Sequence, residues 1–266
     1  MEVTQASRPP LAAWRPALYR WYWQAERVIA PGLRSSQYAY YERLRDALEG
    51  GGHWLDLGCG HQVFGEWMGR EEQEVIGRSR AAVGIDLDWE GLRRHRAMPG
   101  KVSGDLQRLP FQSGSCAVVS ANMVVEHLAE PARVLEEVHR VLRPGGVFVF
   151  HTPNYLHWGT LVAARLPERL KKSLIWYFEE RQEDDVFPVH YRMNTAAAVR
   201  RLAPSCGFDI VDLAMVSTSA TLKMLGPLVL LELAFIRLLE RPRLAKLRSN
   251  IVVVLRKRAE DRGRVS

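Results

Sequence analysis

The sequence predicts an α/β fold built on a doubly wound, mostly parallel sheet. From His53 onward, short apolar segments alternate with helix-like segments, and the first apolar segment ends in a turn that holds Gly58 and Gly60. Repeated strand–helix units of this length build parallel sheets with right-handed crossovers. The chain has 266 residues, 47% of them apolar, which suffices for one large domain with added elements.

Each predicted element follows from a local pattern. The helices begin at capping residues or at a proline and end near glycines. Strands are predicted at 54–57, 82–85, before 104–106, 117–121, 147–150, 208–216 and 250–255. Helices are predicted at 37–48, at 131–142 and at 194–202, where Asn194 would be the capping residue.

Residues 1–50 are expected to form a helical N-terminal extension that is separate from the core. Aromatic residues stand beside arginines here, as in the segment from Tyr19 to Trp23. Such a mixture suits a membrane interface, although it more often packs a helix onto its own domain. The core of the domain is expected at 51–154.

Residues 155–191 fit the strand–helix rhythm poorly and are expected to form a cap insertion over the acceptor site. They hold Trp158, Trp176, Tyr177 and Phe178, followed by the acidic run 179–185. A long insertion after a sheet strand commonly covers the active site. Residues 192–266 would then complete the core, with an apolar helical insertion at 222–245.

The apolar segment 225–239 has two charged residues, Glu232 and Arg237, and precedes a basic tail. A helix that spans a bilayer needs about 20 apolar residues, so spanning is disfavoured. Three interpretations remain open: a helix buried within the domain, a dimer contact, or a helix lying on an anionic membrane through 222–248. From 237 to 266 the chain has ten basic and three acidic residues, a net charge of +7.

The composition limits the partners and the compartment. No basic run is interleaved with aromatic residues, so nucleic acid is not an expected partner. The cysteines Cys59, Cys116 and Cys206 lack metal-ligand spacing, and we expect no metal site. The pattern of a signal peptide is missing. These features favour a cytoplasmic protein, with association at the inner face of the membrane left open.

The turn after the first strand reads Asp56-Leu-Gly58-Cys59-Gly60. A dinucleotide-binding turn requires a third glycine, and Val63 occupies that position, which disfavours a nicotinamide-dependent oxidoreductase. A carboxylate at the strand end suits a cationic ligand, such as the sulfonium and amino group of S-adenosylmethionine (SAM). Acids also follow the next two strands, at Asp86 and Asp105. Such acids can accept hydrogen bonds from ribose hydroxyls and from an adenine amino group.

The segments WLDLGCG (54–60), VGIDLD (83–88), GDLQRLPFQSGS (104–115), ANMVVEHL (121–128), RVLRPGG (140–146) and HTPN (151–154) occur in the order found in one family. On these motifs the chain resembles the class I SAM-dependent methyltransferases, in the branch related to quinone-biosynthesis methyltransferases. The resemblance implies a Rossmann-like sheet of seven strands with an antiparallel last strand. It departs from the family pattern at His61-Gln62.

The resemblance also implies roles for individual residues. The methionine end of SAM would lie against Asp56, Gly58, Cys59 and Gly60. Asp86 and Leu87 would contact the ribose, Asp105 and Leu106 would flank the adenine, and Asn122 would lie near the sulfonium.

No catalytic residue is evident from the sequence. His127, His157 and His190 are weak candidates for a base that deprotonates a hydroxyl, and His151 lies in the same region. The sequence favours methyl transfer to a hydroxyl oxygen of a small or lipid-like acceptor. Carbon methylation of a quinone-like acceptor and a non-catalytic, SAM-binding regulatory or scaffold protein remain alternatives. The oligomeric state is not predicted.

Overall fold

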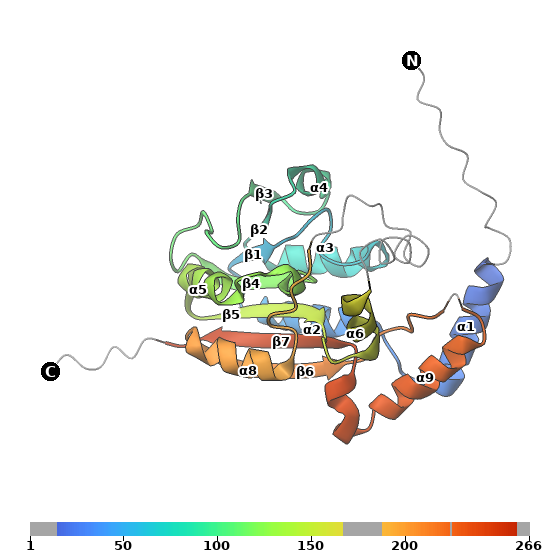
Figure 1. Cartoon of the computed structure of the whole chain (residues 1–266). Helices are drawn as coiled ribbons and strands as arrows, with labels where there is room; N and C mark the ends of the chain where they lie inside the picture. Colours follow the sequence, from blue (N-terminus) through green and yellow to red (C-terminus); the bar gives the residue numbers. More distant parts are fainter. Residues whose placement is uncertain (1–14, 167–187, 224, 260–266) are drawn as a thin grey trace, which may run out of the picture.

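The structure is a computed structural model that describes residues 15–166, 188–223 and 225–259 (Figure 1). Its centre is a seven-stranded sheet with the strand order β3-β2-β1-β4-β5-β7-β6. The strands are β1 (His53–Leu57), β2 (Ala81–Asp86), β3 (Gly100–Ser103), β4 (Cys116–Asn122), β5 (Leu142–Pro153), β6 (Phe208–Val216) and β7 (Asn250–Lys257). β7 runs antiparallel to both neighbours, which confirms the predicted fold class.

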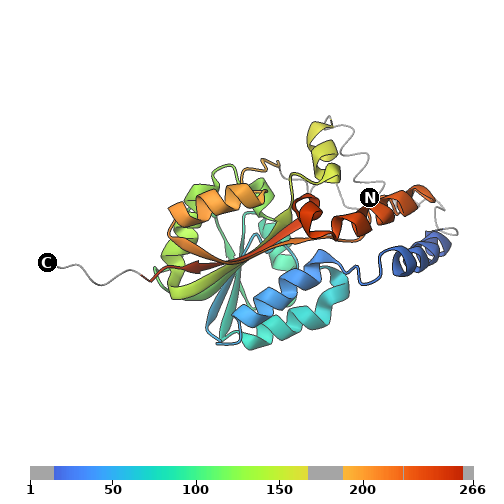
Figure 2. The same cartoon turned by 90° about the horizontal axis from the view of Figure 1, so that it is seen from below.

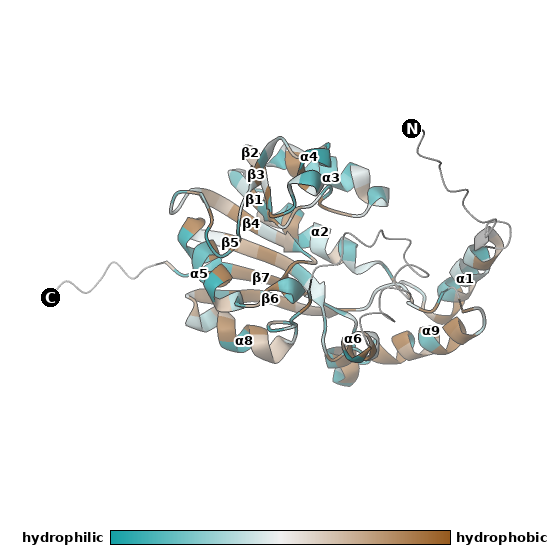
Figure 3. Ribbon diagram, turned by 45° about the horizontal axis from the view of Figure 1, so that its top comes forward, coloured by the Kyte–Doolittle hydropathy of each residue, from teal (hydrophilic) through white to brown (hydrophobic). Residues whose placement is uncertain are grey.

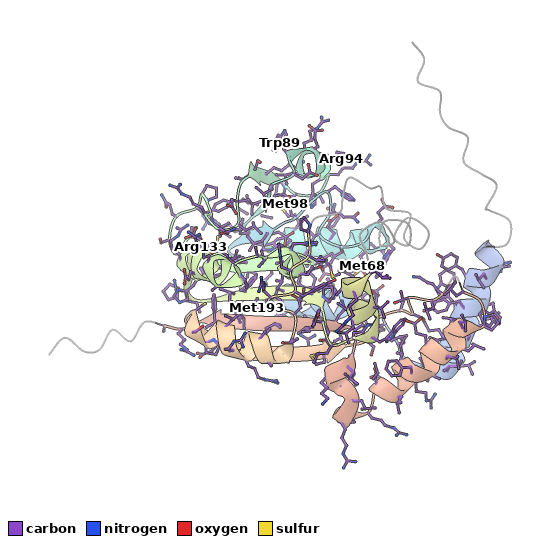
Figure 4. All side chains as sticks on the ribbon, in the orientation of Figure 1. Met68, Trp89, Arg94, Met98, Arg133 and Met193 are labelled. Atoms are coloured by element: carbon purple, nitrogen blue, oxygen red, sulfur yellow. The ribbon has the colours of Figure 1, made fainter. Side chains whose placement is uncertain are left out.

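Helices follow most of the strands, as the alternating sequence pattern predicts. They are α1 (Arg15–Ile29), α2 (Ser36–Ala47), α3 (Gly69–Arg78), α4 (Trp89–Arg94), α5 (Pro131–Val141), α6 (Trp158–Arg165), α8 (Ala196–Ser205) and α9 (Leu228–Leu239). Short 3₁₀ turns lie at η1 (Glu66–Met68), η2 (Val125–His127) and η4 (Pro242–Leu247). Trp89 and Arg94 of α4 project from the β3 end of the sheet (Figure 4).

Helices cover both faces of the sheet (Figure 2). On one face, Val134 and Val138 of α5 and Val199 of α8 are buried against the strands. On the other face, Leu44 of α2 and Val75 of α3 are buried in a second cluster. Successive strand residues point to opposite faces, so the strands carry the apolar residues of both clusters (Figure 3).

The structure corrects the expectation that residues 1–50 are separate from the core. Tyr40, Leu44 and Leu48 are buried in the same cluster as Trp54 of β1. The spacing of four residues puts these three side chains on one face of the chain, which therefore packs on the sheet. Within the described part of residues 1–50, α1 stands apart from the sheet and α2 does not (Figure 1).

Two local predictions also change. Thr195, not Asn194, caps α8, because its side chain accepts a hydrogen bond from the Ala198 amide. Asn194 is buried and donates to the Thr152 hydroxyl and the Pro153 carbonyl. β5 begins at Leu142, five residues earlier than its predicted start at Val147, and its register with β4 shifts between Cys116 and Val118.

α1 and α9 form a two-helix arm beside the sheet (Figures 1 and 2). Tyr22 of α1 packs with Val229 and Leu233 of α9 in a cluster of its own. The arm leaves the sheet at its carboxyl edge, because Val216 at the end of β6 pairs with Asn250 at the start of β7. Within the described residues, no helix has the length and apolar character needed to cross a bilayer.

Candidate active site

The turn after β1 requires a glycine at position 58. Gly58 has a φ of +58°, and a Cβ atom there would meet Val124 Cγ2 at 2.6 Å. The Gly58 amide donates to the Ile85 carbonyl at 2.7 Å, which ties the turn to β2. Gly60 has a φ of +49°, but a Cβ atom there would meet nothing within 4 Å. The backbone at Gly60 therefore borders open space that can admit a ligand.

Asp86 joins the loops that follow the first three strands. Its Oδ2 accepts from the Gly60 amide at 2.8 Å, and its Oδ1 accepts from the Asp88 amide at 2.9 Å. Its backbone carbonyl accepts from the Gly104 amide at 3.1 Å. Backbone donors therefore hold the carboxylate at a fixed position, while the residue stays partly exposed at the carboxyl edge.

The other predicted nucleoside contacts lie beside Asp86 at the same edge. Asp105 is exposed, and its Oδ1 accepts from the Gln107 amide at 2.9 Å. Leu106 is half-buried, and Leu87 is 65% exposed. An exposed leucine beside two acids provides an apolar surface next to hydrogen-bond acceptors, which suits a nucleoside.

Cys59 contributes its backbone to the turn and not its side chain. The side chain is buried against Gly84, where a Cβ atom would stand 2.2 Å from Cys59 Sγ. Burial raises the pKa of the thiol far above its ordinary value, and the charges of Asp56 and Asp86 raise it further. The thiol is thus a packing group under the turn.

Asp56 lies beneath the turn and not on its surface. Its side chain is 1% exposed and lies close enough to Tyr40 of α2 for its charge to act on the Tyr40 hydroxyl. Burial raises its pKa to about 7, although a hydrogen bond donated by Ser120 opposes that shift. Trp54 Nε1 in turn donates to the Ser120 hydroxyl at 2.7 Å. A carboxyl group in this setting carries charge at neutral pH only in part, and a cation nearby would favour its ionised form.

Asn122 links the end of β4 to α2 and to the loop after the glycine turn. Its amide nitrogen donates to Gln37 Oε1 at 2.8 Å and to the Val63 carbonyl at 2.7 Å. Its Oδ1 lies 2.8 Å from His151 Nδ1, which therefore carries the proton. Burial lowers the pKa of His151 to about 3, so this histidine stays neutral. Asn122 thus holds three segments together near the predicted sulfonium position.

Three residues near this cluster were not predicted as site residues. Tyr40 stacks on His151 with ring centroids 5.9 Å apart, and its buried hydroxyl has no hydrogen-bond partner among the described residues. Gln37, one turn earlier on α2, faces the same cluster. Ser120 was detectable as a polar residue inside an apolar strand. Tyr40 was not detectable, because nothing in the helix pattern separates it from the aromatic residues beside it.

Met123 follows Asn122 and has a φ of +59°, which is unusual for a residue other than glycine. Its amide donates to the His151 carbonyl at 2.9 Å, and its side chain is 39% exposed. Strained backbone of this kind clusters at functional sites.

The three candidate bases lie in different surroundings. His127 Nδ1 is 2.9 Å from the Pro188 carbonyl, and the exposed His190 donates its amide to the Glu126 carbonyl at 2.7 Å. These two histidines therefore share one region at the end of β4. His157 lines a narrow hollow with Ser217 and Glu232, on the side of α9. Burial lowers the pKa of His157 to about 4. Most of the expected cap, with Trp176 to Phe178 and the acidic run, lies outside the described residues.

Comparison with known proteins identifies the family. Residues 55–150 match the family model described as a methyltransferase domain. The chain thus carries a class I SAM-dependent methyltransferase domain. The carboxyl edge with Gly58, Gly60 and Asp86 lies within the matched residues. SAM is accordingly the methyl donor of this family.

Two curated relatives illustrate the match. A probable SAM-dependent methyltransferase of Mycolicibacterium smegmatis is 30% identical over 196 residues, which are 70% of this chain and 65% of that protein. A ubiquinone biosynthesis O-methyltransferase of Psychrobacter cryohalolentis is 31% identical over 110 residues, or 38% of this chain and 40% of that protein. The chain thus spans less than two thirds of the length of either relative.

A solved structure shares the fold. The SAM-dependent methyltransferase of Mesorhizobium loti superposes with a TM-score of 0.52 at 22% identity and covers 82% of this chain and 98% of its own. At that identity the likeness concerns the fold alone.

Proposed function

We propose that this methyltransferase transfers the methyl group of SAM to a hydroxyl oxygen of a small or lipid-like acceptor. The observation that carries the proposal is the junction at Asp86, where the loops after β1, β2 and β3 meet beside the open space at Gly60. A fixed, partly exposed carboxylate beside glycine backbone suits a nucleoside with two ribose hydroxyls.

In this proposal each residue at the carboxyl edge has a distinct role. Asp86 accepts the ribose hydroxyls, and Asp105 and Leu106 flank the adenine. Asp56, Gly58 and Gly60 lie at the methionine end, where the positive charge of SAM favours the ionised form of the buried Asp56. Asn122 positions the loop near the sulfonium through its bond to the Val63 carbonyl.

The reaction is an in-line displacement. A lone pair of the acceptor oxygen forms a bond to the methyl carbon, and the carbon–sulfur bond breaks with its electron pair retained on sulfur. The hydroxyl proton passes to a base. The protein mainly has to align the two reacting atoms and exclude water. Among the candidate bases we favour His127 and His190 over His157, because the low pKa of buried His157 makes it a weak base at neutral pH.

Oxygen is favoured over carbon as the methylated atom because one relative is named as an O-methyltransferase. To test this, the protein is incubated with SAM whose methyl group is labelled. One reaction contains a lipid extract as the source of acceptor, and a second reaction contains water-soluble metabolites. The proposal expects S-adenosylhomocysteine and a labelled methyl ether, both reduced in an Asp86→Ala variant when SAM is below saturation. Labelled carbon–methyl product would establish the carbon alternative. SAM binding without any S-adenosylhomocysteine in either fraction would establish a non-catalytic protein.

A further inference from the structure

The outward face of α9 is apolar along its whole length. Leu228, Leu231 and Leu238 are 53%, 71% and 38% exposed, and Ala234 between them is also exposed. The spacing of these residues places them on one side of the helix, opposite the side that packs on α1. We call this surface, formed by Leu228, Leu231, Ala234 and Leu238, the α9 outer face.

The two charges that interrupt the apolar run do not interrupt this face. Glu232 is buried, and its carboxylate accepts from the amides of Thr221 and Leu222 at 2.9 and 2.7 Å. Arg237 lies on the flank and donates to the Ile29 carbonyl at the end of α1, at 2.8 Å. The two charged residues therefore interrupt the apolar run in the sequence, but they do not interrupt the α9 outer face on the surface of the protein.

The neighbouring helix shows what a water-exposed face in this arm looks like. α1 exposes Arg20, Gln24 and Arg27 along the middle of its outward side, with the exposed Trp23 and Val28 on the flanks. A helix on a soluble protein normally turns such a polar face to water, and a helix that is apolar on all sides lies in a protein core or in lipid. The α9 outer face departs from this rule, and an exposed apolar strip of this kind marks an interaction site.

Cations stand next to the α9 outer face. Arg241, Arg243 and Lys246 are exposed in and before η4, and none forms an ion pair with another described residue. The exposed acid of this region, Glu240, is bonded to Arg248 and to Ser217. The surroundings of the apolar face are therefore positively charged.

We propose that the α9 outer face docks on the surface of an anionic lipid bilayer. The leucines would enter the boundary between headgroups and acyl chains, and Arg241, Arg243 and Lys246 would contact lipid phosphates. A 12-residue helix is about 18 Å long, shorter than the hydrocarbon core of about 30 Å, so it lies in the membrane plane. Apposing a second copy of the same face would instead bring like charges together.

The position of the arm connects this surface to the active site. α9 is inserted between β6 and β7 at the carboxyl edge, where the Gly58–Gly60 turn also lies. If the proposed function holds, a lipid-like acceptor would thus reach the SAM site from the bilayer side. Membrane docking itself is measured without SAM or acceptor and stands or falls independently.

The experiment is vesicle flotation of the full chain without SAM, with phosphatidylcholine vesicles that contain or lack phosphatidylglycerol. Three interfacial cations predict binding to the anionic vesicles that is stronger on the order of 100-fold. The charge variant R241Q/R243Q/K246Q should lose this preference. Its matched control, R200Q/R201Q/R256Q, removes three exposed cations elsewhere and should keep it.

The variant L231D/L238D tests the apolar contribution, and its binding to the anionic vesicles should be weaker by a factor of at least about 10. Val211→Asp on β6 is its control, because Val211 is 50% exposed and lies outside the arm. Thermal melting confirms that each variant is folded. Equal binding by L231D/L238D and the unchanged chain would overturn the proposal, as would equal binding to both vesicle types. A dimer that L231D/L238D dissociates, with no vesicle binding, would assign the face to a second copy.

Discussion

Asp56 and Asp86 end neighbouring parallel strands and yet occupy opposite environments. Asp56 is buried beneath α2, and burial raises its pKa to about 7. Asp86 is partly exposed and is held by the amides of Gly60 and Asp88. The difference arises because Asp56 is the penultimate residue of β1 and lies among buried side chains on the α2 side, whereas Asp86 is the last residue of β2 and borders the loop that follows. The protonation state of Asp56 can thus change when a charge is placed nearby, whereas Asp86 presents a hydrogen-bond acceptor at a fixed position.

The largest expected effect concerns the buried acid. Because the pKa of Asp56 is raised in the folded chain, the protonated side chain is stabilised there, and the contribution of Asp56 to stability falls as pH rises from about 4 to about 7, opposite in sign to the contributions of the buried His151 and His157. The loss across this window should approach about 4 kcal/mol. Urea denaturation as a function of pH measures it. Asp56→Asn should remove this dependence, and an unchanged pH profile in the variant would show that Asp56 is not the titrating group.

The two glycines of the turn provide the next test. Gly58→Ala should cost about 2–3 kcal/mol of stability, because the new Cβ adds a clash with Val124 to a positive φ. Gly60→Ala is the matched control and should cost about 1 kcal/mol, since it meets no neighbour. If SAM lies over Gly60, that milder variant still loses SAM affinity in calorimetry. Unchanged SAM affinity in Gly60→Ala would place the ligand elsewhere.

The exposed acid should affect binding more than folding. Asp86→Ala is expected to weaken SAM binding by about 1–3 kcal/mol, the range for a lost charge-assisted hydrogen bond. Asp105→Ala should have a smaller effect, because Asp105 is exposed and water can replace its contact. Calorimetry on both variants ranks them. Equal losses in the two variants would contradict the distinct roles proposed for them.

The smallest expected effect concerns the link to α2. Gln37→Leu removes one partner of the Asn122 amide but leaves the bond to the Val63 carbonyl. We expect a stability loss of about 1 kcal/mol and little change in SAM affinity. Thermal melting and calorimetry check the two expectations. A large loss of SAM affinity would mean that Gln37 itself contacts the ligand.

Local patterns were enough to predict most of the fold. The strand endings at Leu57 and Asp86 follow from apolar runs that stop at glycines and acids, and the sheet follows from their alternation. The packing of α2 on the sheet does not follow from the composition of residues 1–50, because it depends on the spacing of Tyr40 and Leu44 along one helix face. The burial of Asp56 was equally hidden, since the direction of a strand side chain depends on which helix covers that face.

The arm shows a different limit. Sequence left three interpretations open for 225–239, because a one-dimensional run does not reveal that Glu232 points inward. The structure resolves that direction and leaves the apolar strip of Leu228, Leu231 and Leu238 outside. Whether a surface is covered by protein or lipid is decided by partners that no local pattern encodes.

The central claim is that the carboxyl edge around Asp86 binds SAM. Isothermal titration calorimetry of the full chain with SAM and with NAD tests it most directly, with Asp86→Ala as the reference variant. We predict that SAM binds at one site per chain, that the variant binds it more weakly, and that NAD does not bind. Tight NAD binding without SAM binding would contradict the account.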